Sequence, residues 1–340
     1  MKTYRLPLAF VVFTLLATCA LAGPRTFVSG LGNDANPGTR EQPKRTFASA
    51  LAVTDPAGEI VALDSAGFGS TTLTLNKSIS IIAPPGLYAG LRVTSGNAIT
   101  VAAGSNDTVI LRGLTVNSGG GGSNGIVFQS GAALHVENCE VSGFTGGNGI
   151  NSSSPGHLFV ADSVVRRNFT GVYVNNGKLS ADRCRLEKNS NPGLWVGSSA
   201  KGAIRQSVSS GNFFGFLASE IAELSIDDCL AAENSEAGFE SSGSGAKVTV
   251  RHSTARGSRF GFITVEAGSE LNIENCAASG NTDRGVIAFP STVVRLSGST
   301  ITNNAIGVVN SGTLETRQNN TVRGNGSDTA GSAFVVISGI

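Results

Sequence analysis

The sequence is poor in charge, methionine and aromatic residues. Only 14% of its 340 residues are charged, Met and Trp occur once each, and Phe, Tyr and Trp together make up 6%. Because hydrophobic residues still account for 40%, the low charge does not indicate a disordered chain. The formal net charge of +1 gives no basic excess for nucleic-acid phosphates. After the N-terminus no apolar run reaches membrane-spanning length, so we expect no nucleic-acid partner and no membrane span.

Glycine, in contrast, is abundant. The 45 glycines make up roughly 13% of the 340 residues, against an ordinary usage of about 7%. They lack the strict three-residue period of collagen, which excludes that fold. Since glycine weakens helix interiors, the composition also disfavours long helices.

Residues 1–22 have the pattern of a secretory signal peptide. Lys2 and Arg5 precede a short apolar run over 6–17, and small residues lead to Ala22. This pattern predicts cleavage after Ala22 and a secreted or periplasmic protein. Loss of the two basic residues leaves 23 basic and 24 acidic side chains, so the mature chain is nearly neutral.

A glycine followed by an apolar residue recurs every 22 to 24 residues. Between these glycines runs a short alternating apolar segment that ends in Cys or Ser, and Asn usually follows five residues later. We expect the glycines to adopt turn conformations that other side chains disfavour. The recurring residues are Gly125, Gly149, Gly171, Gly193, Gly215, Gly238, Gly261, Gly285 and Gly307.

A repeat of about 23 residues has room for three short strands but not for a helix and its crossover. One such unit cannot bury its apolar face, whereas stacked copies can. The repeat therefore predicts an all-β, single-stranded right-handed parallel β-helix of about 11–12 coils. We place a signal peptide over 1–22, an N-terminal cap over 23–57 and the β-helix over 58–340. Apolar residues at helical spacing within 47–53 predict a short capping helix.

In such a solenoid, equivalent positions form columns along the axis. Phe216, Phe239 and Phe262 follow successive repeat glycines and should stack inside. A second column should bond to the turns of neighbouring coils, and it consists of Asn168, Asn189, Asn212, Asn234, Asn281 and Asn304.

Four cysteines of the mature chain, Cys139, Cys184, Cys229 and Cys276, alternate with serine in one column. Neighbours in this set lie two coils apart, about 9.6 Å by strand spacing. A disulfide needs Cα atoms within roughly 7 Å, so we predict four free, buried thiols and no shared metal site. The fifth cysteine, Cys19, leaves a lipoprotein as an unfavoured alternative, because the Thr before it fits a lipid-attachment signal poorly.

Residues 27–39, 58–86 and 106–116 resemble the N-terminal signature and opening coils of the pectin-lyase-like superfamily, and more narrowly its exported branch. With the repeats, the resemblance covers nearly all of the mature chain. The superfamily includes polysaccharide lyases, glycoside hydrolases, epimerases, phage tailspikes and adhesins. The resemblance is therefore specific for the fold and weak for the activity.

No catalytic residue can be assigned from the resemblance. Hydrolases of this superfamily carry Asn-Thr-Asp, Asp-Asp and Gly-His-Gly in that order. This chain has Asp227-Asp228 before Asn281-Thr282-Asp283 and no Gly-His-Gly. The three histidines, His135, His157 and His252, are expected to face solvent. A lyase or hydrolase with a diverged site remains the alternative to a non-catalytic protein.

Lyases of this superfamily hold calcium with acidic residues on neighbouring coils. The corresponding outward column alternates in sign, which predicts a ladder of opposite charges that stabilises the sheet by about 0.2–1 kcal/mol per pair. This places a basic residue between the acids, which suits one calcium ion poorly, so we expect no cofactor and no metal. The column contains Asp182, Arg205, Asp227, Arg251 and Glu274.

Asp34 and Asn36, in the N-terminal signature, could hold a cation. Asp and Asn also form tight turns unaided, and we favour the turn.

One outward column is unusually apolar: Val127, Asn151, Tyr173, Trp195, Leu217, Glu240, Ile263, Ile287 and Val309. Exposed apolar patches commonly mark binding surfaces, and Tyr and Trp offer flat faces to a sugar ring. We predict a ligand site at Tyr173, Trp195 and Leu217, with Arg185 and Lys188 as basic neighbours. A polysaccharide or a cell-surface partner would bind there; packing between protein chains and simple scaffold packing are the alternatives. The oligomeric state is left open.

Overall fold

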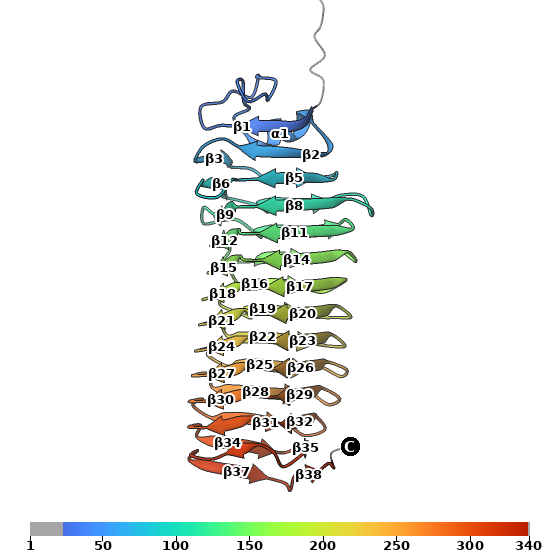
Figure 1. The fold of residues 1–340 in the computed structure, drawn as a ribbon, viewed down its shortest axis with the longest axis vertical. Helices are drawn as coiled ribbons and strands as arrows, with labels where there is room; N and C mark the ends of the chain where they lie inside the picture. Colours follow the sequence, from blue (N-terminus) through green and yellow to red (C-terminus); the bar gives the residue numbers. More distant parts are fainter. Residues whose placement is uncertain (1–22, 339–340) are drawn as a thin grey trace, which may run out of the picture.

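The computed structural model describes residues 23–338, and the predicted signal peptide and Cys19 lie outside this range. Each coil supplies one strand to each of three parallel sheets, so the chain winds into a three-sided solenoid. Figure 1 shows the coils stacked along one axis, from β1 and α1 at one end to β37 and β38 at the other. No helix among the described residues is long and apolar enough to cross a membrane.

Sheet A has fourteen strands. They are β1 (Gly23–Val28), β2 (Thr54–Ala62), β5 (Ile79–Ile82), β8 (Thr108–Arg112), β11 (Ala133–Glu137), β14 (His157–Ala161), β17 (Lys178–Asp182), β20 (Lys201–Arg205), β23 (Glu223–Asp227), β26 (Lys247–Arg251), β29 (Glu270–Glu274), β32 (Val293–Ser297), β35 (Thr313–Thr316) and β38 (Val335–Val336).

Sheet B follows sheet A in each coil and has twelve strands. They are β3 (Ala66–Gly69), β6 (Ala89–Val93), β9 (Leu114–Ser118), β12 (Glu140–Ser142), β15 (Val164–Arg166), β18 (Arg185–Glu187), β21 (Val208–Ser210), β24 (Leu230–Ala232), β27 (Thr254–Arg256), β30 (Ala277–Ser279), β33 (Thr300–Thr302) and β36 (Thr321–Val322).

Sheet C closes the coil, also with twelve strands. They are β4 (Leu73–Leu75), β7 (Ile99–Ala102), β10 (Ile126–Ser130), β13 (Asn148–Ser152), β16 (Thr170–Val174), β19 (Leu194–Val196), β22 (Phe214–Ser219), β25 (Ala237–Ser242), β28 (Phe260–Val265), β31 (Arg284–Ala288), β34 (Ile306–Asn310) and β37 (Ser327–Gly331).

The predicted capping helix is present as α1 (Phe47–Val53). Thr46 caps its N-terminus by accepting a hydrogen bond from the Ser49 amide, and Phe47 packs on Phe68 with ring centroids 5.0 Å apart. The cap does more than cover the end of the solenoid, because β1 pairs in parallel with β2 as the first strand of sheet A.

The Asp34 carboxylate is part of this cap. It accepts hydrogen bonds from the amides of Arg45 and Thr46, each at 2.9 Å, and from the Ser49 hydroxyl. These bonds outweigh its partial burial and hold the pKa of Asp34 below its usual value. The Asn36 side chain donates to the Pro43 carbonyl at 2.9 Å. Both residues thus build the turn that leads into α1, as the turn interpretation expects.

The repeat glycines are not turn residues, contrary to the sequence-based expectation. The corners at positive φ are occupied instead by other residues, such as Arg183 and His252. A Cβ at Gly149 would lie 2.7 Å from the side-chain Nδ2 of Asn168 and 2.8 Å from the backbone carbonyl oxygen of Gly171 in the next coil. Glycine recurs here because neighbouring coils approach too closely for any side chain.

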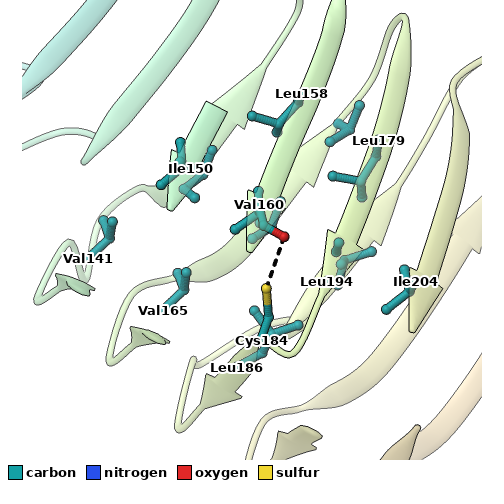
Figure 2. Close-up of a cluster of buried hydrophobic side chains, with 14 of the residues drawn as sticks. Val141, Ile150, Leu158, Val160, Val165, Leu179, Cys184, Leu186, Leu194 and Ile204 are labelled. Atoms are coloured by element: carbon teal, nitrogen blue, oxygen red, sulfur yellow. Dashed lines mark hydrogen bonds between the residues drawn. The ribbon is translucent and has the colours of Figure 1, made fainter. Parts of the chain in front are cut away.

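The cysteine column is confirmed, and all four thiols are free and buried. Each cysteine amide donates to the serine hydroxyl of the next coil, for example Cys184 to Ser207 at 3.0 Å. Figure 2 shows the Cys184 thiol pointing into the apolar interior, where it donates to the Val160 carbonyl at 3.3 Å. Burial raises the pKa of Cys184 to about 11 and that of Cys229 to about 12.

The native protein beginning at Gly23 is therefore expected to be inert to an aromatic disulfide reagent at pH 8. The thiolate is the reactive form, and at this pH burial keeps nearly all of the thiol protonated. After denaturation without reductant, four thiols per chain should react. A rapid reaction of the folded protein, or fewer than four thiols after unfolding, would contradict the column.

The asparagine column forms a buried hydrogen-bonded ladder, also as predicted. The Asn212 side-chain oxygen accepts from the Asn189 amide at 2.8 Å, and the Asn212 amide donates to the Asn234 side-chain oxygen at 3.0 Å. Ser258 replaces asparagine in one coil and accepts from the Asn234 amide at 3.2 Å. The ladder satisfies corner amides that would otherwise be buried without a partner.

Candidate functional site

The outer face of sheet C carries the apolar column predicted from the sequence. The strand register aligns Tyr173 with Trp195, Trp195 with Leu217, and Leu217 with Glu240. The column continues through Ile263 to Val309. These side chains point away from the main core, since the alternate residues of each strand fill the interior.

Most of this column is nevertheless buried, including Leu217, Ile263 and Ile287. Aromatic residues at the strand ends cover it: Phe260 and Phe289 pack with Ile263 and Ile287 in a second apolar cluster outside the solenoid. The C-terminal half of the face is thus scaffold packing, one of the alternatives left open by the sequence.

The N-terminal half of the face is different, because its aromatic residues reach solvent. Tyr173 and Trp195 are half-buried, with ring centroids 4.6 Å apart and planes tilted by 46°. The Trp195 indole donates to the Ser219 hydroxyl at 2.8 Å, which fixes its orientation. Phe169 and Phe213 directly precede the strands β16 and β22 of sheet C, and they are 45% and 41% exposed. We call these four residues the aromatic face.

Arg185 and Lys188 do not join the aromatic face. Arg185 begins β18 in sheet B and pairs with Glu187 at 2.6 Å. Lys188 lies at the corner after this strand, with φ of 54°. The chain turns between sheets B and C after these residues, so proximity to Trp195 in the sequence does not bring them beside it. The structure therefore places the two basic residues of the predicted site on sheet B and its corner, not on the strand face that carries Trp195.

A groove of about 340 Å³ surrounds Glu240, which lies two coils from Trp195 in the same column. Glu240 is only 7% exposed, and within residues 23–338 its carboxyl group makes no hydrogen bond. Burial, and to a smaller degree the charges of Glu236 and Glu266, raises the pKa of Glu240 to about 8. A neutral carboxyl group at pH 7 can both donate and accept a hydrogen bond.

Two arginines from neighbouring coils stand over the same groove. Arg259 pairs with Glu236 at 3.1 Å and lies 4.6 Å from the centre of the Phe260 ring. Arg284 lies 5.6 Å from that ring on the next coil, and its Nε is buried without a hydrogen-bond acceptor. The only sequence signal for this groove is Glu240 itself, a charged residue in an otherwise mostly apolar column.

The charged column on the outer face of sheet A has the predicted register but only part of the predicted pairing. Arg251 binds Glu274 at 2.9 Å, whereas Arg205 makes no ion pair within the described chain. Asp182 binds Arg183 instead, and Asp227 binds His252. Arg183 and His252 occupy corner positions with positive φ. In this conformation their side chains reach the acidic residues of the column, Asp182 and Asp227.

Asp227, Asp228 and His252 form the one group in residues 23–338 whose potential metal-ligand atoms all lie within 4.8 Å of one another. His252 Nδ1 is already hydrogen bonded to Asp227 Oδ1 at 2.9 Å, and two of the three residues are exposed. We assign no metal to it. Asp228 lies at the corner between β23 of sheet A and β24 of sheet B. Asp283 lies at the corner between sheets B and C, before β31 and two coils further on, so the two do not form a hydrolase pair.

The other two histidines lie on the outer face of sheet A rather than in open solvent. His135 and His157 stack on Phe159, with ring centroids 4.5 Å and 3.8 Å from it. His157 also shares a 2.9 Å hydrogen bond with Ser180. Burial, then the positive charge of Lys178, lowers the pKa of His157, which favours the neutral form of this ring in the stack.

Comparisons with known proteins agree with this geometry. A pectate lyase superposes with a TM-score of 0.63 at 18% identity, over 84% of this chain and 80% of its own. The A-module of the Azotobacter vinelandii mannuronan C-5 epimerase AlgE6 gives a TM-score of 0.57 at 16% identity, over 83% of this chain and 91% of the module. An Acinetobacter phage tailspike gives 0.53 at 10% identity, over 92% of this chain and 61% of the tailspike. At these identities the likeness concerns the fold.

No curated protein sequence matches the chain. The family described as right handed beta helix region matches residues 97–255 and 219–339, which together span more than half of the sequence. With the three parallel sheets and the stacked columns, this match identifies the fold. The chain belongs to the right-handed β-helix family.

Proposed function

We propose that the protein is an exported, non-catalytic β-helix that binds a polysaccharide along the outer face of sheet C. The observation that carries the proposal is the aromatic face, where Tyr173 and Trp195 contact each other and remain half-exposed. The signal-peptide pattern of residues 1–22 supports export.

The chemistry of the aromatic face favours a sugar ligand. An aromatic ring offers a flat apolar surface to the C–H face of a pyranose, while its polar tip can bond a hydroxyl group. Tyr173 and Trp195 stand on adjacent coils, about 4.8 Å apart along the axis. An extended glycan lying along the solenoid would therefore meet one ring after another. The apolar surface left for a protein partner is small, because the C-terminal half of the column is already covered by other side chains.

The fold is compatible with such a ligand. The named activities of two superposing proteins, a pectate lyase and a mannuronan epimerase, concern polysaccharides. Asp228 and Asp283 stand at different corners of the coil, which supports binding without hydrolysis.

Trp195→Ala is expected to weaken polysaccharide binding about tenfold, since a ring stacked on an aromatic side chain contributes of order 1 kcal/mol beyond its buried area. Affinity electrophoresis against pectate, alginate, mannan, xylan and soluble β-glucan measures the effect. Tyr88→Ala removes an exposed aromatic residue away from sheet C, and should leave binding unchanged. Trp195→Phe keeps a ring and should retain most of the affinity.

Unchanged binding by Trp195→Ala would refute the site, and absence of binding to any polysaccharide of the panel would refute the ligand class. The same incubations, assayed for unsaturated products and new reducing ends, test the alternative of a lyase or hydrolase. Product formation would replace the non-catalytic proposal.

A further inference from the structure

We propose that the groove around Glu240 is a second subsite on the outer face of sheet C, which holds an uncharged sugar unit through the Glu240 carboxyl group and the Arg284 guanidinium. The inference rests on the proposed function and extends it, because it assigns the ligand's charge and a second point of contact.

The position of the groove suits a ligand that also reaches the aromatic face. Trp195, Leu217 and Glu240 are consecutive members of one column, so Glu240 lies two coils from Trp195, about 9.6 Å along the axis. One oligosaccharide chain can span this distance. The groove volume, about 340 Å³, is at the lower end of the range for small-ligand sites.

Two polar groups in the groove have no hydrogen-bond partner in the described chain. The Glu240 side chain makes no hydrogen bond although the residue is only 7% exposed, and the buried Arg284 Nε has no hydrogen-bond acceptor, since Asp283 Oδ1 lies 3.6 Å away. A buried polar group left unpaired typically costs about 1–3 kcal/mol, so such groups usually serve a ligand or a water. A sugar hydroxyl both donates and accepts, and adjacent hydroxyls can satisfy the carboxyl group and the guanidinium together.

The charges that face the groove favour an uncharged unit over a uronate. Glu236, Arg259 and Arg284 line the groove beside Glu240, while Glu266 and Asp283 lie behind these lining residues and add negative charge. Arg259 is held by Glu236, and Arg284 lies 3.6 Å from Asp283, so neither arginine is a free counterion. A carboxylate ligand would have to compete with these acids for the arginines, whereas a neutral hydroxyl pair would not.

The protonation state of Glu240 gives the subsite a pH dependence. Its pKa of about 8 leaves the carboxyl group mostly neutral at pH 6. Above pH 8 it ionises and loses its donor hydrogen, and a ligand that covers the groove would remove water from the charged form. Binding should therefore weaken as the pH rises.

The test is a titration of the protein with cellohexaose, mannohexaose, an N-acetylglucosamine hexamer and hexagalacturonate at pH 6 and pH 9.5, followed by calorimetry. We expect an uncharged hexamer to bind best, with at least a tenfold loss of affinity at pH 9.5. Glu240→Gln should bind within threefold of the unmodified protein at pH 6 and lose the pH dependence. Glu240→Leu should bind at least tenfold more weakly at both pH values.

Full binding by Glu240→Leu, the same pH dependence in Glu240→Gln, or a preference for hexagalacturonate would overturn the subsite. Trp195→Ala separates the two proposals: if it abolishes binding while both Glu240 variants bind normally, the aromatic face stands and the subsite falls. If no hexamer binds the unmodified protein, both fall. Should Glu240→Leu not fold, the pH profile of Glu240→Gln still decides.

Discussion

Glu240→Gln is expected to stabilise the protein strongly at pH 9 and to change its stability little at pH 5. The folded protein holds the Glu240 pKa near 8, whereas the unfolded chain has the ordinary value of about 4.5. Between these values the folded state retains a proton that the unfolded state has released. The free energy of unfolding therefore falls as the pH rises through this window, and the fall is complete above pH 8.

The size of the effect follows from the separation of the two pKa values, since one pKa unit corresponds to about 1.4 kcal/mol. The full effect is on the order of 5 kcal/mol, and Gln, which carries no charge, avoids it. Guanidinium unfolding of both proteins at pH 5, 7 and 9 measures the difference. Glu41→Gln, at an exposed position in the cap, is the matched control and should show no such trend. Parallel pH profiles for the unmodified protein and Glu240→Gln would show that Glu240 is not buried as a neutral acid.

Phe239→Ala is expected to cost about 3–5 kcal/mol of unfolding free energy, the range for truncating a buried phenylalanine. Phe239 is fully buried in the predicted stack, with ring centroids 5.3 Å from Phe216 and 4.9 Å from Phe262. The coils above and below hold the cavity open, because their backbones are fixed by the strand ladders on all three sides. Denaturant unfolding measures the loss.

The exposed Tyr88 provides the comparison for this variant, and Tyr88→Ala should change stability by less than 1 kcal/mol. A cost below 1 kcal/mol for Phe239→Ala as well would mean that the phenylalanine stack does not form.

The interior of the solenoid was predictable from the sequence because it is periodic. Cys184 and Ser207 occupy equivalent positions in consecutive repeats, and the structure joins them by a hydrogen bond between coils. The same reasoning placed Phe239 between its two neighbours and Asn212 in the ladder. In each case a column needs only the repeat length and the parallel register.

The outer surface was less predictable, because burial there depends on contacts between different columns. Glu240 is buried by residues at the strand ends, such as Phe260 and Arg259, whose spacing from it follows no period. Arg185 lies ten residues from Trp195, yet the corner between sheets B and C separates them. The pairing of Asp227 with His252 depends on a positive φ that the sequence pattern did not indicate.

Trp195 is the sole tryptophan of the chain, so its fluorescence reports directly on the aromatic face. The decisive measurement is the emission of Trp195 during titration with a polysaccharide that the affinity panel identifies. Ligand stacking on the half-exposed indole should shift the emission to shorter wavelength and protect it from quenching by iodide, at concentrations that match the affinity from calorimetry. Saturable binding by calorimetry that leaves the emission and quenching of Trp195 unchanged would show that the ligand binds elsewhere, and would contradict the proposed site.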